Sequence, residues 1–373
     1  MTNVLWLPGK YCQGKGLLAD AGRFIAPYGK KPFILWEQFL KDAYGQQFQA
    51  SLAAAGLSCA DEIFAGETTK STAKRIADRV RETSCDIVVG IGGGKAIDTA
   101  KGAAAFASVN CVIVPSIASN DAPSSACTVW YTDAGEFDGF DMWQRNPDMI
   151  LVDTEIIAKA PVRFFVAGMG DALATWPEAS AGYAKRAIAC TGGTQTLTAM
   201  AMARLCFDTI LQYGVEAKAA VQQQVVTPAV EKVIEANILL SGVGWESGGL
   251  ATAHAIANSL PMMHETHGKL HGEKVSFGLI TQLCLDENAN IEDIYRIVDF
   301  QVAVGLPVTL ADMNMQDVSR ERLLEFARAV SGEGSFVHNH PFVVTPEMIV
   351  DAMIAADSLG TRRKALANEQ RGE

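Results

Sequence analysis

The sequence predicts a two-domain fold: an α/β, Rossmann-like N-terminal domain and an all-α C-terminal domain, with the active site in the cleft between them. The chain has 373 residues, and at roughly 150 residues per domain this length indicates two domains. Short apolar runs alternate with helical stretches in the first part of the chain, whereas only helical patterns follow. We therefore expect a first domain over residues 1–160 and a second over residues 161–373.

The first domain contains a series of short apolar runs typical of buried strands. A helical pattern with apolar residues at Ala73, Ile76, Ala77 and Val80 lies between two of these runs. Strands joined by amphipathic helices form a parallel sheet with right-handed crossovers. The expected strands are 32–36, 60–64, 87–91, 111–114 and 149–152, and the expected helix is 69–84.

The second domain shows helical periodicity without strand-like alternation. Thr227 followed by Pro228 has the form of an N-cap and a first helical residue, and Pro261 is expected to stop a helix. No internal repeat or long linker interrupts the pattern. The expected helices are 170–185, 194–213, 228–240, 247–260 and 273–285.

Composition restricts the class of partner and the compartment. The net charge of −11 disfavours nucleic acid, because binding to phosphates depends on cationic side chains. The N-terminus lacks a basic region followed by an apolar stretch, and no run of about 18 apolar residues occurs, so we expect neither export nor a membrane partner. The eight cysteines include no CxxC pair and are expected to be reduced, as in a cytoplasmic protein.

A glycine-rich segment, residues 90–101, is the sharpest local signal. Gly92, Gly93 and Gly94 stand where a strand ends and a helix opens, and they are followed by Lys95 and Asp98. Glycines at such a turn let phosphates approach the backbone amides of a helix N-terminus, which predicts a pyrophosphate site. The segment is not the usual dinucleotide fingerprint, which follows the first strand. The alternative is a tight turn that packs the helix on the sheet.

Two further segments bear on the ligand. Glu37 ends the first expected strand, and a carboxylate there can bond ribose hydroxyls while repelling a 2′-phosphate, which favours NAD over NADP. The loop 115–125 follows a strand and carries hydroxyls that can bond phosphate or carboxamide, with Asp121 available to a substrate hydroxyl. The alternatives are a solvated strand end and an ordinary set of turns. The loop hydroxyls concerned are Ser116, Ser119 and Ser125.

Histidines gather in one part of the second domain, at His254, His264, His267 and His271. The zinc-protease motif HExxH is absent. One carboxylate, such as Asp171, with two imidazoles suits Zn²⁺ or Fe²⁺ and leaves an open position for substrate. The alternatives are a buried His254 bonded to a carbonyl and an Asp171 that caps a helix. Spacing alone does not decide between these interpretations.

Taken together, these segments resemble the iron-containing, or group III, alcohol dehydrogenases and, within them, the glycerol dehydrogenases, whose architecture is shared with dehydroquinate synthase. The resemblance runs nearly end to end, with its motifs in the same order. These motifs are residues 8–11, 90–101, 119–125, 131–137, 170–176, 246–251, 253–255 and 271–275.

The resemblance implies that Asp171, His254 and His271 hold one divalent metal, zinc in the glycerol dehydrogenases and iron in many relatives. It places Glu37 at the cofactor ribose and Asp121 against the substrate, and it suggests a homo-oligomer, often an octamer. The sequence departs from the commoner family pattern at Glu37, Asn120, Cys127 and 262–265, and the changes at Asn120 and 262–266 leave the preferred alcohol open. The resemblance also implies an NAD site lined by Gly94, Lys95, Ser116, Ser119, Ser125, Cys127 and Tyr131.

The expected activity is therefore reversible, metal-dependent, NAD-linked oxidation of glycerol or a related vicinal diol to dihydroxyacetone. The runner-up is an NAD- and metal-dependent cyclase or lyase of the dehydroquinate synthase type, which needs Lys and Arg around its phosphorylated substrate. Residues 246–260 contain neither, which disfavours it. A non-catalytic nucleotide-binding protein is the third alternative. The native metal, the proton path and the roles of His264 and His267 stay open.

Overall fold

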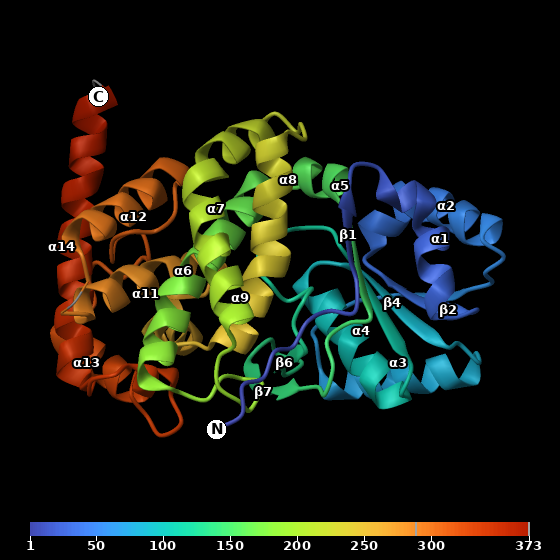
Figure 1. Cartoon of the computed structure of the whole chain (residues 1–373), viewed down its shortest axis with the longest axis horizontal. Coiled ribbons are helices and arrows are strands. Elements are labelled where there is room, and N and C mark those ends of the chain that lie inside the picture. Colours follow the sequence, from blue (N-terminus) through green and yellow to red (C-terminus); the bar gives the residue numbers. More distant parts are fainter. Residues whose placement is uncertain (288, 372–373) are drawn as a thin grey trace.

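The computed structural model describes residues 1–287 and 289–371. Within these residues the predicted fold class is confirmed: every strand lies between Tyr11 and Asp153, and only helices are assigned after Pro161. Figure 1 shows the sheet with its covering helices at one end of the molecule and the helical domain at the other. Residue 288 and residues 372–373, the end of the predicted second domain, lie outside the described residues.

The N-terminal domain is built on a parallel sheet with the strand order β1-β8-β5-β4-β2-β3. Register places Ile91 of β4 beside Trp36 of β2, and Gly92 beside Pro115 of β5. The carboxyl ends of these three strands therefore meet at one edge, where open α/β sheets bind ligands. The strands are β1 (Tyr11–Gly14), β2 (Pro32–Trp36), β3 (Ala60–Ile63), β4 (Ile87–Gly92), β5 (Asn110–Pro115) and β8 (Met149–Asp153).

Helices cover both faces of the sheet, because its strands are apolar on both sides. Trp36 and Val89 pack with Phe48 of α2 on one face, and Leu35 and Val88 pack with the helices of the other face. All five predicted strands are present, with ends that differ by at most one residue. The covering helices are α1 (Ala21–Ile25) and α2 (Gln38–Ala54) on one face and α3 (Lys70–Glu82) and α4 (Gly94–Ala107) on the other.

Three strands were not predicted. β1 has only four residues, two of them polar, and an antiparallel hairpin of β6 (Cys127–Tyr131) and β7 (Phe137–Met142) lies outside the sheet. The β7 strand leaves Phe137 and Phe140 exposed, so its apolar pattern does not mark a buried face. Strands that pack so little of their length carry a weak sequence signal.

The C-terminal domain consists of packed helices. Thr227 caps α8, with its Oγ1 accepting from the Val230 amide, and Pro228 is the first helical residue, as predicted. Among the described helices none is long and apolar enough to cross a membrane. After the connecting helix α5 (Thr154–Lys159), the helices are α6 (Val162–Lys185), α7 (Leu197–Gln222), α8 (Pro228–Glu235), α9 (Ser241–Gly248), α10 (Thr252–Ser259), α11 (His271–Leu285), α12 (Ile291–Val304), α13 (Arg320–Val330) and α14 (Pro346–Arg371).

Four helical predictions need correction. The predicted helix 194–213 is α7, which starts three residues later and continues nine residues further, to Gln222. α6 begins at Val162, so Asp171 lies inside a helix and is not its N-cap. The predicted helix 247–260 is broken at Gly249, whose φ of 98° ends α9 and lets α10 start in a new direction. The segment 228–240 ends in a π-helical turn, Ala236–Leu240, an irregularity that periodicity does not reveal.

The loop after β5 is bonded to this irregular region of the helical domain. The Asn237 side chain in the π-helical turn donates to the carbonyl oxygens of Ala118 (3.0 Å) and Phe165 (3.1 Å). Ser124 Oγ donates to the carbonyl of Ile238 at 2.6 Å. These buried hydrogen bonds fix the position of the loop against the helices.

Candidate active site

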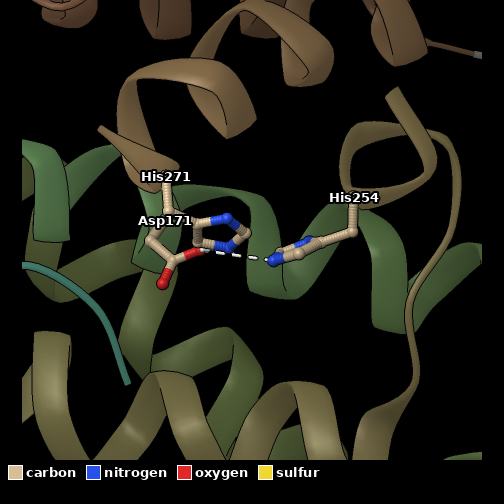
Figure 2. A group of neighbouring side chains, drawn as sticks. All are labelled: Asp171, His254 and His271. Carbon is tan, nitrogen blue, oxygen red and sulfur yellow. Dashed lines mark ion pairs between the residues drawn. The ribbon is translucent and has the colours of Figure 1, made fainter. Parts of the chain in front are cut away.

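Asp171, His254 and His271 come together although they are far apart in the sequence. They project from α6, α10 and the first residue of α11, and Figure 2 shows their side chains pointing toward one another. The Nε2 atoms of His254 and His271 lie 3.3 Å and 3.4 Å from Oδ1 of Asp171. One ligand atom from each of the three lies within 4.8 Å of the others, a spacing that fits a single metal ion.

The burial of the cluster sets its electrostatics. The Asp171 side chain is 1% exposed and neither carboxylate oxygen has a hydrogen-bond partner, whereas the His271 side chain is 39% exposed. Burial would raise the pKa of Asp171, but the imidazoles of His271 and His254 outweigh it and hold that pKa below its usual value. A buried carboxylate without a partner is costly, and a cation between it and the two imidazoles would satisfy it.

Glu178 supports His254 and was missed in the sequence. Its side chain is fully buried, and Oε2 lies 2.5 Å from Nδ1 of His254. Burial would lower the pKa of His254, but Glu178 and Asp171 raise it well above the usual value. Glu178 follows Asp171 by about two turns of α6 and therefore shares its face. That spacing is the only signal that pointed to it.

The other two histidines of the predicted segment lie outside the cluster. His264 is 82% exposed on its side chain and pairs with Glu265. His267 is exposed, and its Nε2 lies 2.9 Å from the carbonyl oxygen of Pro261. Of the four neighbouring histidines, the structure thus selects His254 and His271 as the candidate ligands.

Asp121, in the loop after β5, bonds the helical domain and interacts electrostatically with the cluster. Ser241 Oγ, at the start of α9, donates to Asp121 Oδ2 at 2.8 Å. Burial raises the pKa of Asp121 to about 8, and the Asp171 carboxylate adds to the shift, while Ser241 and His254 oppose it. A carboxyl group of the loop after β5 therefore lies close enough to Asp171 and His254 for their charges to act on it, and Ser241 is its unpredicted partner.

The glycine turn lies beside Glu37 and Ser116, as the strand register requires. The Glu37 amide donates to the carbonyl of Ile91, and the Ser116 amide donates to that of Gly92. Burial raises the pKa of Glu37, and the backbone amide of Gly93 partly opposes the shift. A Cβ on Gly92 would lie 2.7 Å from Cβ of Ala96 and 2.9 Å from Cδ of Glu37, so only glycine fits there.

Gly93 and Gly94 leave the start of α4 open. Gly93 is the N-cap and has no side-chain hydrogen bond, and the first turn of α4 holds no acidic residue. A Cβ on Gly94 would meet only Nδ2 of Asn120, at 3.8 Å. The Gly93 amide bonds the Glu37 carboxylate, whereas the amides of the first turn of α4, from Gly94 on, are available to an anion, as a pyrophosphate site requires.

Lys95 and Asp98, which follow the glycine turn, both form ion pairs with other side chains of the N-terminal domain. Lys95 Nζ pairs with Glu67 at 2.6 Å, with its side chain 52% exposed above the turn. Asp98 is buried in α4, where it pairs with Lys101 Nζ at 2.8 Å and accepts from the Val129 amide at 2.9 Å. These contacts fix the β6–β7 hairpin to α4, and the predicted role of Asp98 toward a cofactor stays a prediction.

The remaining predicted residues lie in the loop after β5 and in β6, the strand that follows it. Ser119 and Ser125 lie in the loop after β5, where the Ser125 hydroxyl approaches the carbonyl of Ala122. Cys127 and Tyr131 are the first and last residues of β6. Burial raises the pKa of Cys127 to about 12, so its thiol stays protonated. Their roles toward a cofactor stay predictions.

Comparison with known proteins agrees with this architecture. Residues 8–154 match the family described as iron-containing alcohol dehydrogenase. The glycerol dehydrogenase of Citrobacter freundii is 44% identical over 360 residues, covering 96% of this chain and 98% of that protein. The glycerol dehydrogenase of Thermotoga maritima is 46% identical over 369 residues, covering 98% and 100%.

The fold is also that of a solved relative. The crystal structure of glycerol dehydrogenase from Schizosaccharomyces pombe matches with a TM-score of 0.92 at 33% identity, covering 100% of this chain and 93% of that one. Similarity of sequence and fold extends over both domains. The chain therefore belongs to the iron-containing alcohol dehydrogenase family and, within it, is similar to the glycerol dehydrogenases.

Proposed function

We propose that this protein is an NAD-dependent glycerol dehydrogenase that reversibly oxidises the secondary hydroxyl of glycerol to dihydroxyacetone. The observation that carries the proposal is the cluster of Asp171, His254 and His271, in which a buried carboxylate without a hydrogen-bond partner lies between two imidazoles. The glycerol dehydrogenases that are 44% and 46% identical support the choice of substrate.

The metal we propose is Zn²⁺, held by one carboxylate oxygen and the Nε2 atoms of the two histidines. Three protein ligands of this kind are typical of catalytic zinc, because they leave one position for substrate. The donor set also accommodates Fe²⁺. The partly exposed His271 supports access for a small polyol from solvent.

The cofactor we propose is NAD, with its pyrophosphate at the start of α4 and Glu37 at the adenosine ribose. The uncapped start of α4 at Gly94 supports the first assignment, and the nearness of Glu37 to Gly92 supports the second. We propose that Lys95, Ser116, Ser119, Ser125, Cys127 and Tyr131 line the rest of this site.

In the reaction, a bound divalent cation supplies Lewis acidity that favours loss of the hydroxyl proton, and nicotinamide supplies the acceptor for the hydride. Glycerol loses one proton and one hydride, so NAD⁺ becomes NADH and a proton is released. Asp121 accepts a hydrogen bond from a substrate hydroxyl and so orients the carbon that is oxidised. Ser241 holds Asp121 in place from the helical domain.

Several finer assignments complete the proposal. We place the domain boundary between residues 160 and 161, in the short connection between α5 and α6. The eight unpaired cysteines support work in the reducing cytoplasm. We also propose a homo-oligomer. The cyclase alternative is not favoured, because α9 and α10 carry no Lys or Arg for a phosphorylated substrate.

The test is an absorbance assay for NADH combined with metal analysis of the purified protein. Glycerol, 1,2-propanediol and ethanol are each supplied with NAD or NADP. We expect turnover of the vicinal diols with NAD, much slower turnover with NADP or ethanol, and one metal ion per chain.

Removal of the metal is part of the same test. Dialysis against a chelator should abolish NADH formation and lower the melting temperature, and added Zn²⁺ should restore both, because a ligand present at about 100 times its Kd adds about 2.7 kcal/mol of stability. A metal-loaded protein that forms no NADH from any vicinal diol would refute the proposed activity.

A further inference from the structure

The helix that carries His254 lacks a cap of its own. Ala251, the N-cap of α10, offers no side-chain acceptor to the amides at the helix start. Two side chains from other helices take that place. Glu178 Oε1 accepts from the amides of Ala251 (2.8 Å) and His254 (2.9 Å), and Gln282 Oε1 accepts from the Ala253 amide (3.0 Å).

These two caps connect the candidate metal ligands to one another. Glu178 lies on α6, the helix of Asp171, and Gln282 lies on α11, the helix of His271. The start of α10 is therefore bonded to both of the helices that carry the other two ligands. The distances between the three ligand atoms depend on these buried contacts.

Glu178 alone also controls the imidazole ring. With Oε1 occupied by two backbone amides, Oε2 lies 2.5 Å from His254 Nδ1. A carboxylate only accepts hydrogen bonds, so Nδ1 must carry a proton, and the proton displaced by a bound metal would be the one on Nε2, whose lone pair the metal would then use. That atom faces Asp171 Oδ1 at 3.3 Å. A carboxylate in this position is also known to make imidazole a more basic ligand.

We propose that Glu178 is a positioning residue for the metal: it caps α10 and selects the tautomer in which His254 offers Nε2. The inference rests on the proposed role of His254 as a metal ligand. Glu178 would thus have two roles: it places α10, and it fixes which nitrogen of His254 carries the proton. A suitable substitution at position 178 removes the second role and keeps the first.

Glu178→Gln is that substitution. The two backbone amides require an acceptor, so the glutamine oxygen must face Ala251 and His254. Its amide NH₂ then faces His254 Nδ1 and donates to it, which shifts the proton to Nε2 and removes the lone pair that the metal needs. The cap is kept while the tautomer is reversed.

The experiment measures two quantities in the unmutated protein and in each variant. The first is Zn²⁺ affinity, by competition with a chromogenic chelator, and the second is the melting temperature of the metal-free protein. We expect Glu178→Gln to weaken Zn²⁺ binding about 10- to 100-fold. The metal-free fold should change little. Gln282→Ala is the matched control, because it removes a cap of α10 without touching the ring; it should lower the melting temperature and change Zn²⁺ affinity far less.

A measurement on the unmutated protein covers the case in which Glu178→Gln does not fold. In the zinc-loaded protein labelled with ¹⁵N-histidine, NMR should show the His254 proton on Nδ1; a proton-free Nδ1 would overturn the inference. Unaltered Zn²⁺ affinity in folded Glu178→Gln would overturn it as well. By contrast, retention of Zn²⁺ by His254→Ala would show that the proposed metal site itself is wrong.

Discussion

Ser241 Oγ donates a hydrogen bond to Asp121 Oδ2 across the junction of the two domains, at 2.8 Å. Ser241 begins α9, directly after the π-helical turn, and Asp121 belongs to the loop that follows β5. The bond joins the carboxylate proposed to orient the substrate to the domain that supplies the metal ligands. It is thus a direct link between the two halves of the proposed site.

Loss of this bond should slow the reaction without loss of the metal. Above its pKa of about 8 Asp121 is ionised, and Ser241→Ala then removes a hydrogen bond to a charged group, which contributes about 1.5–3 kcal/mol. We expect kcat/KM for glycerol, measured at about pH 9, to fall at least about tenfold. Steady-state kinetics and metal analysis check this. Ser331→Ala, at the distant end of α13, serves as a control, and equal kinetics in both variants would contradict the role of Ser241.

The histidines of the second domain should divide into two classes. His254→Ala and His271→Ala each remove one of three ligands, so we expect both metal content and NADH formation to fall to background. His267→Ala is the matched control, because His267 lies only four residues before His271 and bonds a carbonyl instead. Elemental analysis of the three variants measures the difference. A metal-loaded His271→Ala protein with normal turnover would refute the ligand assignment.

Gly94→Ala should separate cofactor binding from folding. Its Cβ would meet only Asn120 Nδ2 at 3.8 Å, and alanine favours a helix, so the melting temperature should not fall. The added methyl group nevertheless stands where phosphates must approach the α4 amides, so KM for NAD should rise about tenfold or more. Gly92→Ala, whose Cβ would lie 2.7 Å from that of Ala96, should instead lower the melting temperature. Unchanged NAD binding in Gly94→Ala would mean that the pyrophosphate binds elsewhere.

Asp312 should contribute to the pH dependence of the free energy of unfolding. Burial would raise its pKa, but Lys364, 2.6 Å from Oδ1, and the Val308 amide hold the pKa below its usual value. A lowered folded-state pKa stabilises the fold above the unfolded-state value of about 4, and this contribution is lost as pH falls through the folded-state pKa.

Asp312→Asn should therefore lower stability most near neutral pH, and its difference from the unmutated protein should shrink below about pH 4. Urea unfolding at several pH values measures this difference. Asp317→Asn, at an exposed aspartate five residues further on, is the control. A difference that does not depend on pH would contradict the electrostatic explanation.

The sheet could be predicted because its strands are short, apolar and buried on both faces. The strand Pro32–Trp36 was predicted to the residue, and the glycine turn after β4 followed from composition alone. The local pattern of apolar residues is sufficient to predict a strand where both faces of the sheet are buried. The hairpin of β6 and β7 was missed because its outer side chains, such as Phe137, stay exposed.

The site could be predicted only in part. Residue types suggested Asp171, His254 and His271, but their convergence depends on the packing of α6, α10 and α11, which spacing does not encode. Glu178 was missed because a glutamate inside a helix is usually solvated, and only tertiary structure shows that it is buried against His254.

The anchoring of the loop after β5 has a consequence for motion. Asn237, Ser124 and Ser241 bind that loop to the helical domain, whereas Glu37 and the glycine turn belong to the sheet. Lys101 of α4 also donates to the carbonyl oxygens of Ala122 and Ser125, so the same loop is bonded to both domains. A rotation of one domain against the other would have to break buried hydrogen bonds on one side of Asp121, which favours a fixed interface through which substrate and product pass without a large domain movement.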